Sequence, residues 1–84
     1  MKEEIVNEII RFLKVDVINS PDVVIGEDDL IVEQGLIDSL GIVRLISHLQ
    51  EHFKIQNIER KDVVLDNFKS ISRVAALVSR YVSN

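Results

Sequence analysis

Apolar residues recur at helical spacing in three parts of this chain, and the pattern predicts amphipathic helices over about residues 2–17, 39–53 and 71–84. The apolar faces consist of Ile5, Ile9, Phe12 and Leu13 in the first helix, Ile42, Leu45, Ile46, Leu49 and Phe53 in the second, and Ile71, Val74, Ala75, Val78 and Val82 in the third. Asp38 and Ser70 stand where N-caps are expected for the two later helices.

The remaining segments lack a continuous pattern. Residues 18–37 contain the only proline and two of the three glycines, which predicts a long ordered loop. Its apolar residues Val23, Val24, Ile25, Leu30 and Ile31 are expected to hold it down. A short helix is predicted over about 61–65, although Val63 and Val64 suit a strand as well. We therefore expect an all-α fold, a small four-helix bundle of three longer helices and one short one, with a long loop between the first two.

Composition narrows the class of protein. A chain of 84 residues, 46% apolar and 29% charged, is expected to fold as one domain, residues 1–84. It has no cysteine, which excludes disulfides and thiolate metal sites. Its net charge of -4 and its scattered basic residues argue against a nucleic-acid partner. No apolar run is long enough to span a membrane, so a cytoplasmic location is expected. A monomer is expected as well.

The candidate chemistry lies in the stretch GLIDSLG, residues 35–41. Asp38 is expected to cap the second helix, and Ser39 then falls in the first helical turn, where free N–H groups and the helix dipole favour an anion. On the helical count, Leu40 and Val43 point away from the core face and lie next to Ser39. This pattern indicates a docking surface beside a hydroxyl group.

Two other kinds of site can be set aside. His48 and His52 lie roughly 13 and 20 Å from Ser39 by helical rise, so neither can activate it as a nucleophile, and the Gly-x-Ser-x-Gly spacing of a hydrolase is absent. The acidic run at residues 27–33 lacks the alternating ligands and the glycine of a calcium loop. The two histidines are expected on a solvated or flanking face, and no metal site is expected.

The stretch DDLIVEQGLIDSLGIVRLISHLQEHFKI resembles the acyl carrier protein family, including its aminoacyl and peptidyl carrier branches. The similarity consists of an Asp-x-Leu step ending at Leu30, a Gly-Leu step at Gly35, the Asp38-Ser39-Leu40 opening of the second helix, and a closing Phe53-Lys54-Ile55. The later stretch NFKSISRVAALV is similar to the entry of the family's last helix. The resemblance spans essentially the whole chain.

This resemblance implies a specific role. Ser39 is the expected attachment site of a 4'-phosphopantetheine arm, transferred from coenzyme A by a phosphopantetheinyl transferase, and Asp38 accompanies it. The arm's thiol then carries a cargo as a thioester between an acyl- or aminoacyl-activating ligase and downstream acyl-processing enzymes, so the chain is not itself an enzyme. The residues expected to be recognised by partners are Leu40, Val43, Arg44, Ser47, Glu27, Asp28, Asp29 and Glu33.

The second helix also departs from the family pattern. Carriers for fatty acid synthesis usually have an acidic second helix, whereas this one has Gly41, Arg44 and Gln50. These departures weaken the case for generic fatty acid partners. The stretch DSLG followed by NFKSI resembles free-standing carriers that load an amino acid or a specialised acyl group. This resemblance implies a dedicated ligase, in a pathway of lipid, natural-product or cell-envelope biosynthesis. Gly41 is compatible with close approach of a partner or of the arm, or with a tolerated weakness. The alternative function is an unmodified carrier-like module that binds a protein through Leu40 and Val43.

Overall fold

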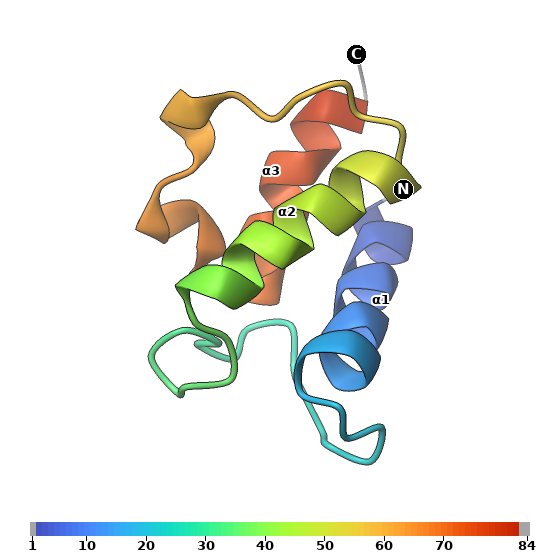
Figure 1. Ribbon diagram of the computed structural model, residues 1–84, viewed down its shortest axis with the longest axis vertical. Coiled ribbons are helices and arrows are strands. Elements are labelled where there is room, and N and C mark those ends of the chain that lie inside the picture. Colours follow the sequence, from blue (N-terminus) through green and yellow to red (C-terminus); the bar gives the residue numbers. More distant parts are fainter. Residues whose placement is uncertain (1, 83–84) are drawn as a thin grey trace.

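A computed structural model describes residues 2–82 and shows a helical protein (Figure 1). Helices α1 and α3 pack against each other, and α2 lies across them. No strand forms within the described residues, although an isolated antiparallel bridge pairs Leu30 with Ser70. The elements are α1 (Lys2–Phe12), the π-helical turn η1 (Leu13–Val17), α2 (Ser39–His52), the 3-10 turns η2 (Arg60–Asp62) and η3 (Leu65–Phe68), and α3 (Ile71–Val82). None of these helices is long and apolar enough to cross a membrane.

The all-α class is confirmed, but the predicted count of four helices is not. The described chain forms three α-helices, and the short helix expected over 61–65 is replaced by η2 and η3. Between these turns, Val64 has an extended backbone, with φ -124° and ψ 153°. Two adjacent β-branched valines disfavour a helix here, while Phe68, which is only 2% exposed, anchors η3 in the core.

The long loop between η1 and α2 is fastened to the start of α3. The Ile31 N–H donates to the Lys69 carbonyl over 3.0 Å, and the Ser72 N–H donates to the Glu27 carbonyl over 2.8 Å. These bonds satisfy backbone groups that would otherwise have no regular partner. The loop is therefore ordered without being helical, as its composition predicts.

Only part of the expected apolar anchoring of this loop is observed. Ile25 and Ile31 are buried in the core, and Val23 packs partly against it. Val24 is 89% exposed and Leu30 is 40% exposed, so the expectation that they hold the loop was wrong. The backbone bridge between Leu30 and Ser70 orders the loop at this point without burying the leucine side chain.

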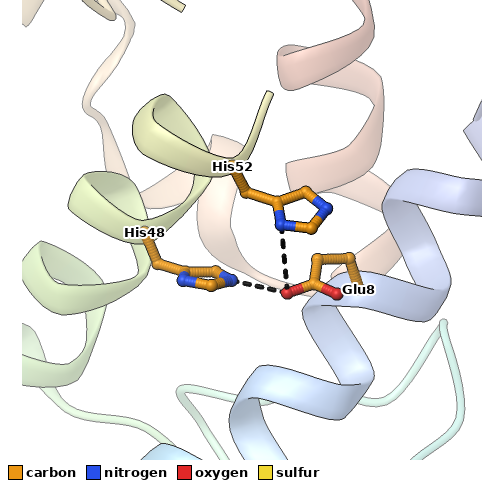
Figure 2. Close-up of side chains that lie close together, drawn as sticks. All are labelled: Glu8, His48 and His52. Atoms are coloured by element: carbon orange, nitrogen blue, oxygen red, sulfur yellow. Dashed lines mark hydrogen bonds and ion pairs between the residues drawn. The ribbon is translucent and has the colours of Figure 1, made fainter. Parts of the chain in front are cut away.

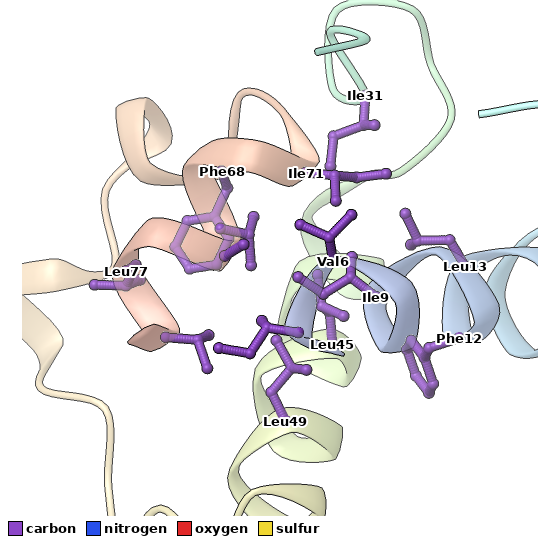
Figure 3. Packing of buried hydrophobic residues seen from close by; sticks show 14 of the residues in the cluster. Val6, Ile9, Phe12, Leu13, Ile31, Leu45, Leu49, Phe68, Ile71 and Leu77 are labelled. Atoms are coloured by element: carbon purple, nitrogen blue, oxygen red, sulfur yellow. The ribbon is translucent and has the colours of Figure 1, made fainter. Parts of the chain in front are cut away.

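The core combines the predicted faces of the three helices with further residues, among them Ile31, Phe68 and Leu77 (Figure 3). In α2 the predicted face is buried most deeply at its centre, because Leu45 and Leu49 are fully buried and its other members are only partly covered. The Ser70 cap is also confirmed, since its Oγ accepts the Arg73 N–H over 3.3 Å. The largest fully buried side chains are Phe68, Ile5, Ile9, Leu13, Ile31, Leu45, Leu49, Ile71, Leu77, Val74 and Val78.

Candidate functional site

Ser39 is the first residue of α2, and its side chain is exposed. The preceding residue, Asp38, caps the helix as predicted: its Oδ1 accepts the Gly41 N–H over 2.9 Å. The Ser39 hydroxyl has no hydrogen-bond partner within the part of the chain that the structure describes. Because the Asp38 side chain satisfies only the third amide of the helix, the amides of Ser39 and Leu40 have no partner within the helix.

Ile37 anchors the turn before Ser39 in the core. This side chain is only 3% exposed, and its backbone N–H donates to the Ile31 carbonyl over 3.0 Å. Gly35 turns the chain with a φ of +76°, a conformation that glycine adopts at little cost. The Ser39 hydroxyl therefore lies on a short segment that is anchored in the core by Ile37 and fixed to α2 by the Asp38 cap.

The packing of Ile37 explains why residue 41 is a glycine. A Cβ at this position would lie 2.6 Å from Cγ1 of Ile37 and 3.3 Å from its Cδ1. The close approach left open by the sequence is therefore made by the protein's own Ile37, which packs into the space that a side chain would fill. Glycine at this point allows the turn before Ser39 to lie tightly against the start of α2.

The predicted apolar surface beside Ser39 is present and is larger than the sequence indicated. Leu40 is 69% exposed and Val43 is 58% exposed, in agreement with their helical phase. The connecting segment adds Val63, Val64 and Leu65, which are 40%, 47% and 61% exposed. In the sequence, the only sign of this additional apolar surface is the run Val63-Val64-Leu65, which has no helical spacing.

All of these side chains except Leu40 border an apolar groove that begins at Ser39. The groove has a volume of about 260 Å³ and lies between α2 and the η2–η3 segment. We call it the α2–η3 groove, and its lining residues are Ser39, Ile42, Val43, Val63, Val64, Leu65 and Phe68. Several exposed apolar side chains gathered next to an exposed hydroxyl suit contact with a partner protein.

Arg44 and Ser47 lie elsewhere around α2. The guanidinium of Arg44 donates to the Asp16 carbonyl over 2.9 Å, so it ties α2 to η1. Arg44 also borders a second hollow, of about 270 Å³, on the side of Ser39's turn that faces Leu36 and Asp38. Ser47 is exposed further along α2 and lines neither hollow.

The predicted acidic residues are not gathered at Ser39. Asp28 Oδ1 accepts the Ser72 hydroxyl over 3.1 Å, and Asp29 Oδ2 accepts the Gly26 N–H over 2.7 Å, so both carboxylates order the loop. Glu33 is exposed, and none of these three acids lines either hollow beside Ser39. The structure therefore brings Asp38, Leu40 and Val43 to the serine and leaves the loop acids at the start of α3 and on the loop surface.

The residues around Ser39 fit a phosphodiester-linked arm. The hydroxyl is accessible and is not engaged by other side chains of the described chain. The free amides of the first turn and the positive end of the helix dipole favour a phosphate at this position. The donor set is therefore suited to a serine phosphodiester, with room for an arm to leave the surface.

Comparison with known proteins identifies the same class of site. A family model described as "Phosphopantetheine attachment site" matches residues 3–78, which is nearly the whole chain. No curated protein and no solved structure matches the chain. Proteins of this family carry a covalently attached 4'-phosphopantetheine, interact with phosphopantetheinyl transferases and partner enzymes, and are generally non-catalytic. The chain therefore belongs to the phosphopantetheine attachment site family.

Proposed function

We propose that this chain, as one domain, is a carrier protein that tethers an acyl or aminoacyl intermediate on a 4'-phosphopantetheine arm attached to Ser39. The observation that carries the proposal is the exposed and unengaged hydroxyl of Ser39 at the start of α2, in a chain of this family. When attached, the arm supplies a terminal thiol that holds cargo as a thioester. The chain's own residues present the hydroxyl, orient the arm and bind partners.

Attachment joins the Ser39 oxygen to the phosphorus that bears the pantetheine chain in coenzyme A. The pyrophosphate bond breaks, adenosine 3',5'-bisphosphate leaves, and the hydroxyl proton passes to a base of the transferase. The neighbouring carboxylate, Asp38, accepts the Gly41 N–H as the cap of α2. We therefore assign the chemistry to the transferase and the presentation of the hydroxyl to this chain.

Partner recognition is proposed to use the α2–η3 groove together with Leu40. Exposed apolar side chains at the centre of an interface contribute more to binding than surrounding contacts. The net charge of -4 favours partners that present lysine and arginine. Glu27, Asp28, Asp29 and Glu33 can contribute to this field from the loop, at some distance from the attachment point.

The surface of α2 favours a specialised pathway with a dedicated ligase. Its first turn contains no acidic residue, and Arg44 adds a positive charge at the hollow that Asp38 and Leu40 also line. Gln50 is used by the fold, because its Oε1 accepts the Ile58 N–H over 2.8 Å. A partner that recognises this helix must bind apolar side chains and an arginine rather than a row of carboxylates.

The test is incubation of the purified chain with coenzyme A and a promiscuous phosphopantetheinyl transferase, followed by intact mass measurement. We expect a gain of one phosphopantetheine unit in the wild type and in Ser79→Ala, and no gain in Ser39→Ala. Failure of the wild type to gain mass would favour the unmodified interaction module instead. Retention of the gain in Ser39→Ala would place the arm on another residue.

A second arm of this experiment tests the carrier role itself. The modified chain is offered to aminoacyl and fatty acyl ligases, and cargo is detected as a further mass gain that hydroxylamine removes. Hydroxylamine cleaves a thioester readily, so this sensitivity distinguishes cargo on the thiol from cargo on a side-chain amine. Loading by fatty acyl ligases alone would contradict the aminoacyl branch.

A further inference from the structure

A cluster of three potential metal ligands lies away from Ser39, where α1 faces the C-terminal half of α2 (Figure 2). Glu8 extends from α1, and His48 and His52 extend from α2. The His48 Nε2 lies 2.5 Å from Glu8 Oε2, and the His52 Nδ1 lies 3.8 Å from the same oxygen. One candidate ligand atom of each residue lies within 4.8 Å of the other two.

The spacing of these residues matches the requirements of a zinc ion. Histidines four residues apart on a helix present their rings on one face, and zinc commonly takes imidazole nitrogens together with a carboxylate oxygen. Tetrahedral bonds of about 2.0–2.1 Å place ligand atoms about 3.3 Å apart. The two observed distances to Glu8 Oε2, 2.5 and 3.8 Å, lie on either side of this value. Both distances are within about 1 Å of the spacing that zinc requires, and water would supply the fourth ligand.

Two of the ligands are already held in place. The His48 ring stacks on Phe12 with its centroid 4.3 Å away and an interplanar angle of 14°. Arg11 donates to both oxygens of Glu8, over 3.0 and 2.7 Å. These two bonds fix the orientation of the Glu8 carboxylate at the cluster. A carboxylate and a ring that are preoriented lose less freedom when they bind an ion.

Arg11 brings a positive charge directly to the cluster, and this charge opposes a cation. Its side chain is 49% exposed, so solvent screens its charge, and Asp16 lies 4.0 Å from it on the other side. Arg11 Nε can keep its bond to Glu8 Oε1 while Oε2 exchanges its bond to Arg11 Nη2 for the ion. The arginine then acts as the outer partner that orients a ligating carboxylate, an arrangement typical of metal sites.

We propose that Glu8, His48 and His52 form a binding site for a divalent transition metal, with Zn²⁺ as the best-matched ion, which links α1 to α2. The proposal is independent of the arm on Ser39. Its expected effect is structural, because the ion fixes the crossing of two helices. Binding the folded state alone raises the melting temperature as the metal concentration exceeds Kd.

The test uses the full chain without a polyhistidine tag, freed of metal with a chelator. Zinc chloride is titrated by calorimetry, and Co²⁺ replaces it for absorption spectroscopy, in which d–d bands report ligand geometry. We expect one Zn²⁺ per chain, a higher melting temperature with zinc, and visible bands characteristic of tetrahedral Co²⁺. Absence of saturable one-to-one binding would overturn the proposal.

The variants separate a metal site from a merely structural cluster. His52→Gln is the main variant, because His52 is 47% exposed and its loss leaves the contact between Glu8 and His48 intact. We expect it to fold as the wild type does with chelator present and to bind Zn²⁺ more than tenfold more weakly. Glu51→Gln, an exposed acid on the same helix, is the matched control and should bind as the wild type does. Equal affinity of His52→Gln and the wild type would exclude the site.

Discussion

Replacement of Gly41 by alanine is expected to destabilise the protein, although glycine is normally the poorer residue in a helix. The new Cβ would lie 2.6 Å from Cγ1 of Ile37, far inside normal contact distance. Ile37 is only 3% exposed and is held by the Ile31 carbonyl, so it has little room to withdraw. Either the isoleucine leaves its place in the core or the start of α2 shifts outward.

The magnitude results from two opposing terms. Alanine gains about 1 kcal/mol over glycine in a helix interior. Overpacking a well-filled core costs about 1–3 kcal/mol. The expected net effect is a loss of about 1 kcal/mol in the free energy of unfolding, which lowers the melting temperature of a domain of this size by about 4–8 °C.

The assay is thermal and urea unfolding followed by circular dichroism, with Gly26→Ala as the matched control. At Gly26 the added Cβ would lie 3.5 Å from the nearest atom, an oxygen of Asp29, and φ is not positive. This control should gain about 0.4–1 kcal/mol, because alanine restricts the unfolded chain. The reasoning is refuted if Gly41→Ala is as stable as the wild type or more stable while Gly26→Ala behaves as expected.

Three further predictions concern other parts of the molecule. The hydrogen bond that Tyr81 donates to Asp62 raises the pKa of this single tyrosine above its usual value of 10. In Asp62→Asn, the midpoint of a tyrosine titration followed at 295 nm should therefore fall. An unchanged midpoint would contradict the contact. Asp38→Ala should lose about 1 kcal/mol of stability as the cap is lost, whereas Asp38→Asn should keep most of it, as measured by urea unfolding. Leu65→Ser should change the free energy of unfolding by less than about 0.5 kcal/mol, yet it should slow modification by the transferase. Val24→Ser, at another exposed apolar residue, is the control. Equal modification rates for the two variants would show that Leu65 is not part of the recognition surface.

Much of the site was predictable because it depends on local rules. The cap at Asp38 and the outward direction of Leu40 and Val43 follow from helical phase over a few residues, and the structure confirms both. The reason for Gly41 was not predictable, because it depends on where the side chain of Ile37 packs. Local sequence rules specify which way a helix faces but not which neighbour fills a gap.

The remaining differences between the predicted and the observed structure result from long-range packing. The segment around Val63 and Val64 has no helical period, and its path is set by the burial of Phe68 in the core. His48 was expected on a solvated or flanking face, and it is partly buried there, but its stacking on Phe12 and its contact with Glu8, forty residues away in sequence, were not predicted. Such contacts arise only when α1 and α2 pack, which periodicity within one helix cannot reveal.

The central claim is that Ser39 carries the phosphopantetheine arm, and the most direct measurement is tandem mass spectrometry of the chain after incubation with coenzyme A and the transferase. We predict a single modified peptide with the arm on Ser39, since this hydroxyl is exposed at the start of α2 and is not engaged by its neighbours. An arm on any other serine, or a fully active transferase that leaves the chain unmodified, would contradict the account.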